Sequence, residues 1–171
     1  TGRDVVRYYG QTSDRVTVVD PAETYYVRSA ADHHVLENAR VHAFVDALRR
    51  AAEIPLGAAA PEFSDKPRAA AAPSPASASS AARAAHEVRH HALVRAGRLM
   101  LASHASYGHR ARMGSLETDL LVHLLMRHGP RRGIYGAKIT GGGSGGTVAV
   151  LYADTPQAHA ALAEVAQAYR Q

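Results

Sequence analysis

The order of its predicted elements indicates that this 171-residue chain forms an α+β domain, with helices packed on one face of a small, mostly antiparallel sheet. Three observations support this fold class. Segments rich in valine, tyrosine and isoleucine, which favour strands, occur near both ends of the chain. Apolar residues recur three and four positions apart in four other segments, as in amphipathic helices. The chain is also long enough for one domain that buries about 70% of the surface of its unfolded form.

The first block of the sequence, residues 1–56, contains two predicted strands followed by a helix. The strands are the segments RVTVVD at 15–20 and TYYVRS at 24–29, which a proline turn separates. The helix is expected over residues 36–52, and it places the following apolar residues on one face: Val41, Phe44, Val45 and Leu48.

Residues 57–85 interrupt the domain with a segment made largely of alanine, proline and serine. The segment offers very few side chains that a core could bury, so we expect a linker or a disordered surface loop. The whole chain, 1–171, is therefore interpreted as a single domain that carries this insertion.

The last block begins with two predicted helices. The first is expected over residues 86–107. The second follows Ser115, a residue type that caps helix N-termini, and ends at Gly129-Pro130, a strong helix stop.

Two strands and a last helix complete the chain. The strands are predicted over 134–140 and 147–153. The helix begins at Thr155, as cap, with Pro156 in its first turn. Its apolar face is formed by Ala158, Leu162, Val165 and Tyr169.

Composition and charge exclude several classes of protein. The formal charge is +5, but the eighteen arginines occur singly or in pairs, and no basic run is interleaved with aromatic residues, so we expect no nucleic-acid partner. No apolar stretch approaches the length of a membrane span, so we expect no membrane insertion. The absence of cysteine and of a signal-like N-terminus fits a reducing cytoplasm.

The segment KITGGGSGGTVAV, residues 138–150, joins the last two strands through five glycines in six positions. It matches the glycine pattern of a dinucleotide-binding turn, but that motif requires a helix afterwards and here a strand follows. Two interpretations stay open: a tight hairpin that uses glycine for positive φ angles, and a backbone surface that phosphate can approach. Lys138 is expected to be a solvated strand lysine, or else to lend charge to the bend.

The segment HEVRH, residues 86–90, matches the zinc-protease pattern in which two histidines lie one helical turn apart. The extended form of that pattern requires a histidine at position 96, where this chain has an alanine. A zinc hydrolase is therefore only a minor alternative, and no metal ligand is assigned.

Other ionisable residues have ordinary structural explanations. Packing or surface positions are expected for His33 and His34, and a buried, hydrogen-bonded position for His104. Asp119 is expected to be a first-turn helix acid rather than a catalytic base.

The segment YGAKITGGGSGGTVAVL, residues 135–151, resembles the third signature motif of the GHMP sugar kinases, in wording closest to their galactokinase and L-arabinokinase branch. The resemblance extends to the segments LMLASHASYG at 99–108 and ETDLLVHLL at 117–125. It also extends to TYYVRSAADHHVLENARVHAF at 24–44. About 130 residues are covered in this way, with the linker as the gap.

The resemblance implies transfer of the γ-phosphoryl group of ATP, with magnesium, to the anomeric hydroxyl of a monosaccharide of the galactose or L-arabinose class. It implies a ferredoxin-like C-terminal half that forms one wall of a cleft. The family's first two motifs do not occur here, so the N-terminal kinase half, with its catalytic aspartate and magnesium ligands, is expected to be absent and this chain inactive alone. The residues implied to line the nucleotide side of that cleft, and to support the phosphate loop of the absent half, are Thr140, Gly141, Gly142, Gly143, Ser144, Gly145 and Gly146.

The chain departs from the family at one position near the sugar: the family tends to have a tyrosine there, whereas this chain has Leu36. An aliphatic side chain can pack on a sugar but lacks the hydroxyl and the aromatic face. The alternative to a kinase half is a non-catalytic binding or partner module that kept the fold.

Overall fold

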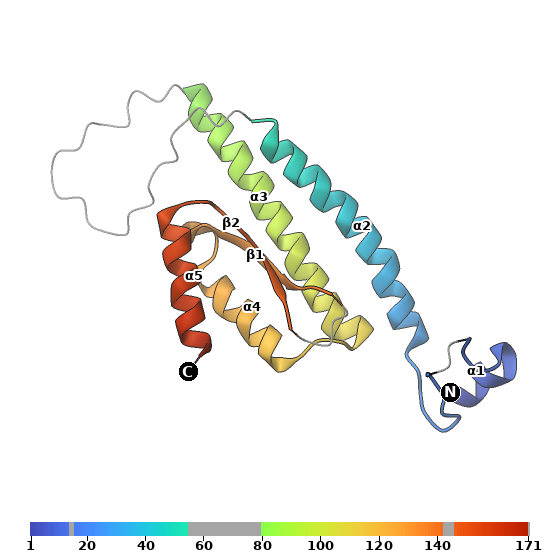
Figure 1. Ribbon diagram of the computed structural model, residues 1–171. Helices are drawn as coiled ribbons and strands as arrows, with labels where there is room; N and C mark the ends of the chain where they lie inside the picture. Colours follow the sequence, from blue (N-terminus) through green and yellow to red (C-terminus); the bar gives the residue numbers. More distant parts are fainter. Residues whose placement is uncertain (14–15, 55–79, 142–145, 171) are drawn as a thin grey trace.

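The computed structural model describes residues 1–13, 16–54, 80–141 and 146–170 (Figure 1). Its helices and strands are, in chain order, α1 (Gly2–Tyr9), α2 (Val27–Ala52), α3 (Ser80–Ser106), the π-helical turn η2 (Tyr107–Ala111), α4 (Leu116–His128), the 3-10 turn η3 (Pro130–Arg132), β1 (Ile134–Ile139), β2 (Val148–Tyr152) and α5 (Pro156–Tyr169). None of the helices in these ranges combines the length and the apolar character that a membrane span requires.

The sheet consists of β1 and β2, paired antiparallel on either side of the glycine bend. Its register runs from Gly136 opposite Leu151 to Ile139 opposite Val148. A bulge near Tyr135 interrupts the pairing at the start of β1. The α+β class and the antiparallel pairing predicted from the sequence are confirmed.

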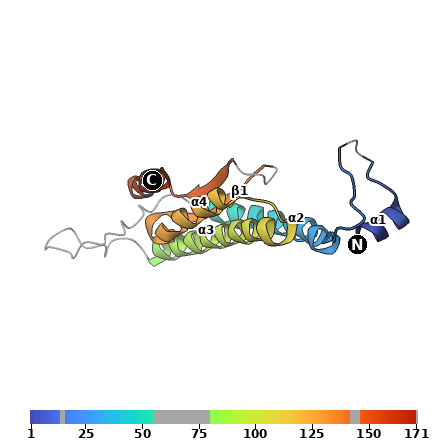
Figure 2. The same ribbon diagram turned by 90° about the horizontal axis from the view of Figure 1, so that it is seen from below.

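Helices cover both faces of the sheet, so the prediction of a single covered face is wrong. Gly136 lies against Gly97 of α3, whereas its neighbour Ala137 joins a buried cluster with α4 and α5. Successive residues of a strand point to opposite faces, so α3 covers one face and α4 with α5 the other. The long helix α2 runs antiparallel beside α3 (Figures 1 and 2).

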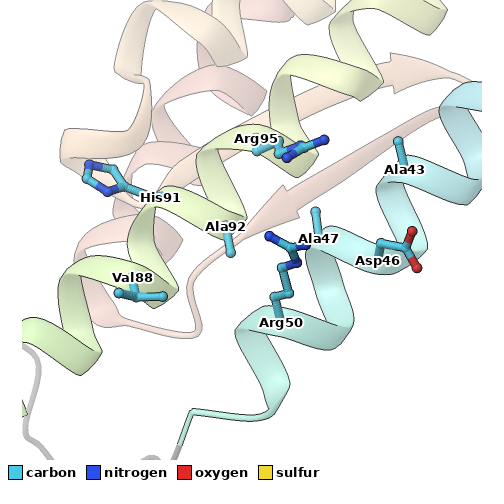
Figure 3. Close-up of a pocket in the computed structure, with 8 residues that line it drawn as sticks. All are labelled: Ala43, Asp46, Ala47, Arg50, Val88, His91, Ala92 and Arg95. Carbon is cyan, nitrogen blue, oxygen red and sulfur yellow. The ribbon is translucent and has the colours of Figure 1, made fainter.

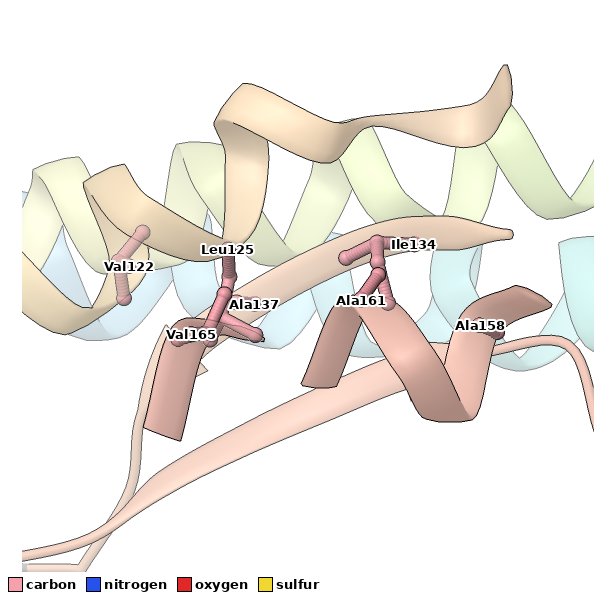
Figure 4. Packing of buried hydrophobic residues seen from close by; sticks show 7 residues of the cluster. All are labelled: Val122, Leu125, Ile134, Ala137, Ala158, Ala161 and Val165. Atoms are coloured by element: carbon pink, nitrogen blue, oxygen red, sulfur yellow. The ribbon is translucent and has the colours of Figure 1, made fainter. Parts of the chain in front are cut away.

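The main core lies between the sheet and the pair α4 and α5 (Figure 4). It consists of Val122, Leu125, Ile134, Ala137, Ala158, Ala161 and Val165. Each large aliphatic side chain in it stabilises the fold by roughly 1.5–3 kcal/mol through burial. Of the stripe predicted for α5, Ala158 and Val165 are buried and Leu162 is partly buried, whereas Tyr169 is exposed.

Both helix caps predicted near the C-terminus are present. The Ser115 hydroxyl accepts a hydrogen bond from the Thr118 amide at 3.3 Å, and Thr155 caps α5 in the same way through Ala158. Helix α4 ends at Gly129, whose φ of 62° is in the left-handed region that favours glycine.

The two strands predicted in the first block are not strands in the structure. Val16 and Val18 are exposed, and residues 27–29 form the first turn of α2. β propensity reflects packing on a sheet surface, and the sheet of the described residues consists of β1 and β2 only. Helix α2 therefore begins nine residues before the predicted start at residue 36.

The predicted linker overlaps a helix at its end. Residues 80–85 form the first turns of α3, because alanine and arginine are good helix formers and the helix continues from the packed part of α3. The rest of the predicted linker, residues 57–79, lies outside the described residues.

Candidate nucleotide-side site at the glycine bend

The base of the glycine bend, which we define as Thr140, Gly141, Gly146 and Thr147, extends the β1–β2 pair by one step. The Thr140 amide donates to the Thr147 carbonyl oxygen at 3.0 Å. Gly141 has a φ of 76° and Gly146 a φ of 105°, and within the described ranges no residue beyond the chain neighbours places an atom within 4 Å of an added methyl group there. The backbone conformation alone therefore favours glycine at both positions.

The prediction that glycine supplies positive φ angles is therefore confirmed at both ends of the bend. The remaining residues implied to lie on the nucleotide side and support the phosphate loop, Gly142, Gly143, Ser144 and Gly145, lie outside the described residues.

Lys138 is not the solvated strand lysine that we predicted. Its side chain points from β1 toward α2, where its Nζ lies 3.3 Å from Glu37 Oε1. The same ammonium lies 5.3 Å from the ring centre of Tyr107, within the range of a cation–π contact. Only 24% of the Lys138 side chain is exposed. The lysine is therefore held between a carboxylate and an aromatic ring, two residues from the bend.

Glu37 is the centre of a compact polar cluster that joins α2, α3 and β1. Its carboxylate accepts hydrogen bonds from the Ser103 hydroxyl, from Arg40 at 2.9 Å and from Lys138 at 3.3 Å. Burial alone would raise the pKa of Glu37, but these three donors outweigh it and hold the pKa below its usual value. The cluster contains one carboxylate and two cations, so it carries a net positive charge.

A cavity of about 260 Å³ opens beside this cluster. Its polar wall is formed by Glu37, Arg40, Ser103 and Lys138. Its apolar wall is formed by Val41, Phe44, Leu99, Met100 and Ala149. The cavity is a combination of apolar surface and a few convergent polar groups, which is typical of ligand sites.

Leu36, predicted to lie on the sugar side, precedes Glu37 on α2. Its side chain is 39% exposed and it does not line the cavity.

The histidines near the bend have structural partners. His33 is buried, and its Nδ1 shares a hydrogen bond of 2.9 Å with the Ser106 hydroxyl. Burial lowers the pKa of His33 below its usual value. His104 Nδ1 accepts from the Ile139 amide at 3.3 Å, and its Nε2 lies 3.2 Å from Asp119 on α4. The predicted hydrogen bonding of His104 on a helix is confirmed, but the residue is partly rather than fully buried. The prediction for Asp119 as a first-turn helix acid is confirmed.

The HEVRH segment lies on α3, far along the helix from the bend. Burial lowers the pKa of His90, whose ring packs edge-on against Tyr135. Within the described residues, no group of three or more histidine, aspartate or glutamate side chains is arranged to hold a metal ion. A hollow of about 390 Å³ near this segment is lined by residues of α2 and α3, including Arg50, His91 and Arg95 (Figure 3).

Sequence reasoning missed Glu37, Ser103 and Tyr107 as site residues. Each is an ordinary residue in its own segment, and only the packing of α2 and η2 against β1 brings them together. The available signal was that all three fall within segments that resemble the sugar kinases, at 24–44 and 99–108.

The structure thus presents an antiparallel hairpin, joined by a glycine-rich segment and covered by helices on both faces. The family described as GHMP kinases C terminal matches residues 81–171, more than half of the chain, and the chain belongs to that family. An L-arabinokinase of Arabidopsis thaliana is 30% identical over 175 residues, an alignment that covers 99% of this chain and 13% of that protein. The chain thus spans only a small part of that relative's length. No solved structure matches the chain.

Proposed function

We propose that this chain is the C-terminal part of an ATP-dependent sugar-1-kinase of the galactokinase and L-arabinokinase type. The enzyme transfers the γ-phosphoryl group of ATP to the anomeric hydroxyl of a monosaccharide of the galactose or L-arabinose class, in the cytoplasm. The observation that carries the proposal is the glycine bend between β1 and β2 in a chain of the GHMP kinase family. The identity with an L-arabinokinase supports the choice of sugar class.

In this function the bend forms the nucleotide side of a cleft. Thr140, Gly141 and Gly146 are described residues of this bend, and glycine, which has no side chain, allows phosphate oxygens to approach amide groups closely. Phosphoryl transfer depends on positioning and on stabilisation of charge. The net positive cluster of Glu37, Arg40 and Lys138 adds a favourable field beside this surface.

Magnesium, which the family implies, has no fitting ligand set among the described residues of this chain. We therefore assign the magnesium ligands and the catalytic base to an N-terminal kinase half, which acts as the partner of this chain. Because one wall of the cleft cannot position both substrates, the chain alone is expected to have no useful activity.

A coupled assay for ADP release tests the proposal. The chain is assayed alone and together with the N-terminal kinase half, with ATP, magnesium and either galactose or L-arabinose. Turnover is expected only when both halves are present. Turnover by the chain alone, or none with either sugar when both halves are present, contradicts the proposal.

Substitution in the bend tests the role of these glycines. In the two-part enzyme, Gly141→Ala is expected to raise the KM for ATP at least tenfold, because alanine disfavours a φ of 76°. Gly10→Ala is a matched control, since Gly10 has a φ of 75° in equally open space but lies after α1. Equal kinetic effects of the two substitutions contradict a role for the bend in ATP binding.

A further inference from the structure

Tyr107 occupies a junction between the helices and the glycine bend. It is the first residue of the π-helical turn η2, directly after α3, and such turns recur at functional sites. Its hydroxyl donates a hydrogen bond of 3.4 Å to the carbonyl oxygen of Gly141, at the base of the bend. Tyr107 thus links the end of α3 to the loop that follows β1.

The ring of Tyr107 is held by two side chains on different elements. His33 of α2 packs edge-on against it with ring centres 4.7 Å apart, and the Lys138 ammonium lies 5.3 Å from its centre. Both neighbours are themselves fixed. His33 is buried and bonded to Ser106, and Lys138 is paired with Glu37. A side chain packed in this way has few rotamers open to it, so its hydroxyl is directed at one place.

The backbone of η2 is also attached to α2. The Ser29 hydroxyl donates to the Arg110 carbonyl at 3.2 Å, and the Arg112 guanidinium lies 3.6 Å from the ring centre of Tyr26. Arg112 closes the turn with a φ of 54°, a positive value found at no other non-glycine residue in the described ranges. Such conformations persist where the surroundings determine them strongly. The turn that carries Tyr107 is therefore a rigid support.

We infer that Tyr107 is a positioning residue for the glycine bend: its hydroxyl holds the Gly141 carbonyl, and Glu37 supports it by holding Lys138 against its ring. This inference deepens the proposed function, since the bend is the part of the chain that we assign to ATP. The contacts place the N-terminal half of α2 and the base of the bend in one connected network. Removal of the tyrosine hydroxyl frees the bend without changing any charge.

Amide hydrogen exchange of the isolated chain, followed by NMR, tests this inference without any kinase activity. The reporter is the Thr140 amide, which donates to Thr147 across the base of the bend. Tyr107→Phe is expected to raise the exchange rate of this amide about fivefold, whereas the Ile139 amide, which His104 holds, keeps its rate. Tyr152→Phe is the control, because Tyr152 lies at the other end of β2. An unchanged Thr140 rate in Tyr107→Phe overturns the inference.

A double-mutant cycle tests the part played by Glu37. Glu37→Gln is expected to raise the Thr140 exchange rate about twofold, and the pair Glu37→Gln with Tyr107→Phe is expected to equal Tyr107→Phe alone, because both act through one contact. If the increase of the Thr140 exchange rate in the double variant equals the product of the increases in the two single variants, the role of Glu37 is overturned. Far-UV circular dichroism of each variant checks that the chain is folded.

Kinetics of the two-part enzyme separate this inference from the proposed function. If Tyr107→Phe speeds exchange at Thr140 and also raises the KM for ATP, both stand. If exchange speeds up and the KM for ATP is unchanged, the positioning role of Tyr107 stands and the assignment of the bend to ATP is wrong.

Discussion

Gly97 of α3 and Gly136 of β1 lie backbone against backbone. A methyl group on Gly136 would lie 2.4 Å from the Gly97 Cα, and one on Gly97 would lie 1.8 Å from the Tyr135 carbonyl oxygen. Neither obstacle is a flexible side chain, so the helix and the strand would have to separate. This contact sets the distance between α3 and the sheet, and with it the place of Lys138 opposite Glu37.

We predict that Gly97→Ala and Gly136→Ala each lower the free energy of unfolding by about 3 kcal/mol, the cost of forcing extra atoms into a packed contact. Chemical denaturation followed by circular dichroism measures the change. Gly108→Ala is the matched control, because no described residue outside its own turn places an atom within 4 Å of the added methyl group. A stability equal to that of the wild type for Gly97→Ala would show that α3 and β1 are not in close contact.

The Glu37 carboxylate makes stability depend on pH in the acid range. Burial raises the pKa of Glu37, but hydrogen bonds from Ser103 and Arg40 and the positive charge of Lys138 lower it by a larger amount. The pKa of Glu37 in the folded protein therefore lies below the ordinary 4.5. The unfolded chain therefore binds this proton more readily than the folded one. The stability that Glu37 contributes is present above pH 4.5 and is lost as the pH falls through the folded-state pKa.

Glu37→Gln is accordingly expected to be less stable than the wild type by about 1–2 kcal/mol at pH 7, through loss of charged hydrogen bonds. The difference shrinks as the pH falls from 5 to 3. Urea denaturation at several pH values measures it. A difference that stays constant over this range would mean that the carboxylate is not ionised in the folded protein.

His33 gives a second pH dependence, nearer neutrality. Burial lowers its pKa below the ordinary 6.5, so protonation is easier in the unfolded chain, and stability falls as the pH drops below 6.5. We predict that His33→Gln reduces the loss of melting temperature between pH 7.5 and 5.5, as measured by circular dichroism. His42→Gln, at an exposed position on α2, should leave that loss unchanged. An identical loss in both variants would contradict the assignment to His33.

The cap at Ser115 should contribute measurably to α4. Ser115→Ala removes the acceptor of the Thr118 amide and is expected to lower the free energy of unfolding by about 1 kcal/mol. Ser115→Asp keeps an acceptor at the same place and should remain close to the wild type. Both values come from equilibrium denaturation, and equal losses in the two variants would show that the hydroxyl is not the cap.

Local signals were sufficient for the C-terminal part of the fold. The strands on either side of the bend, the caps Ser115 and Thr155, and the stop at Gly129 were all predicted from neighbouring residues. Each depends on chemistry within a few positions: a hydroxyl that accepts an amide, or a glycine that takes a positive φ. The same signals misassigned residues 24–29, because tyrosine and valine there had no sheet to join.

Local sequence patterns were therefore enough to predict the hairpin, the helix boundaries near it, and the resemblance to the family. The covering of both sheet faces by helices, the pairing of Lys138 with Glu37, and the hydrogen bond from Tyr107 to Gly141 became evident from the folded structure alone. These contacts join residues 34 to 101 positions apart in the chain. No local pattern specifies such pairs, because they arise from the close packing of α2, α3 and β1 at the contact between Gly97 and Gly136.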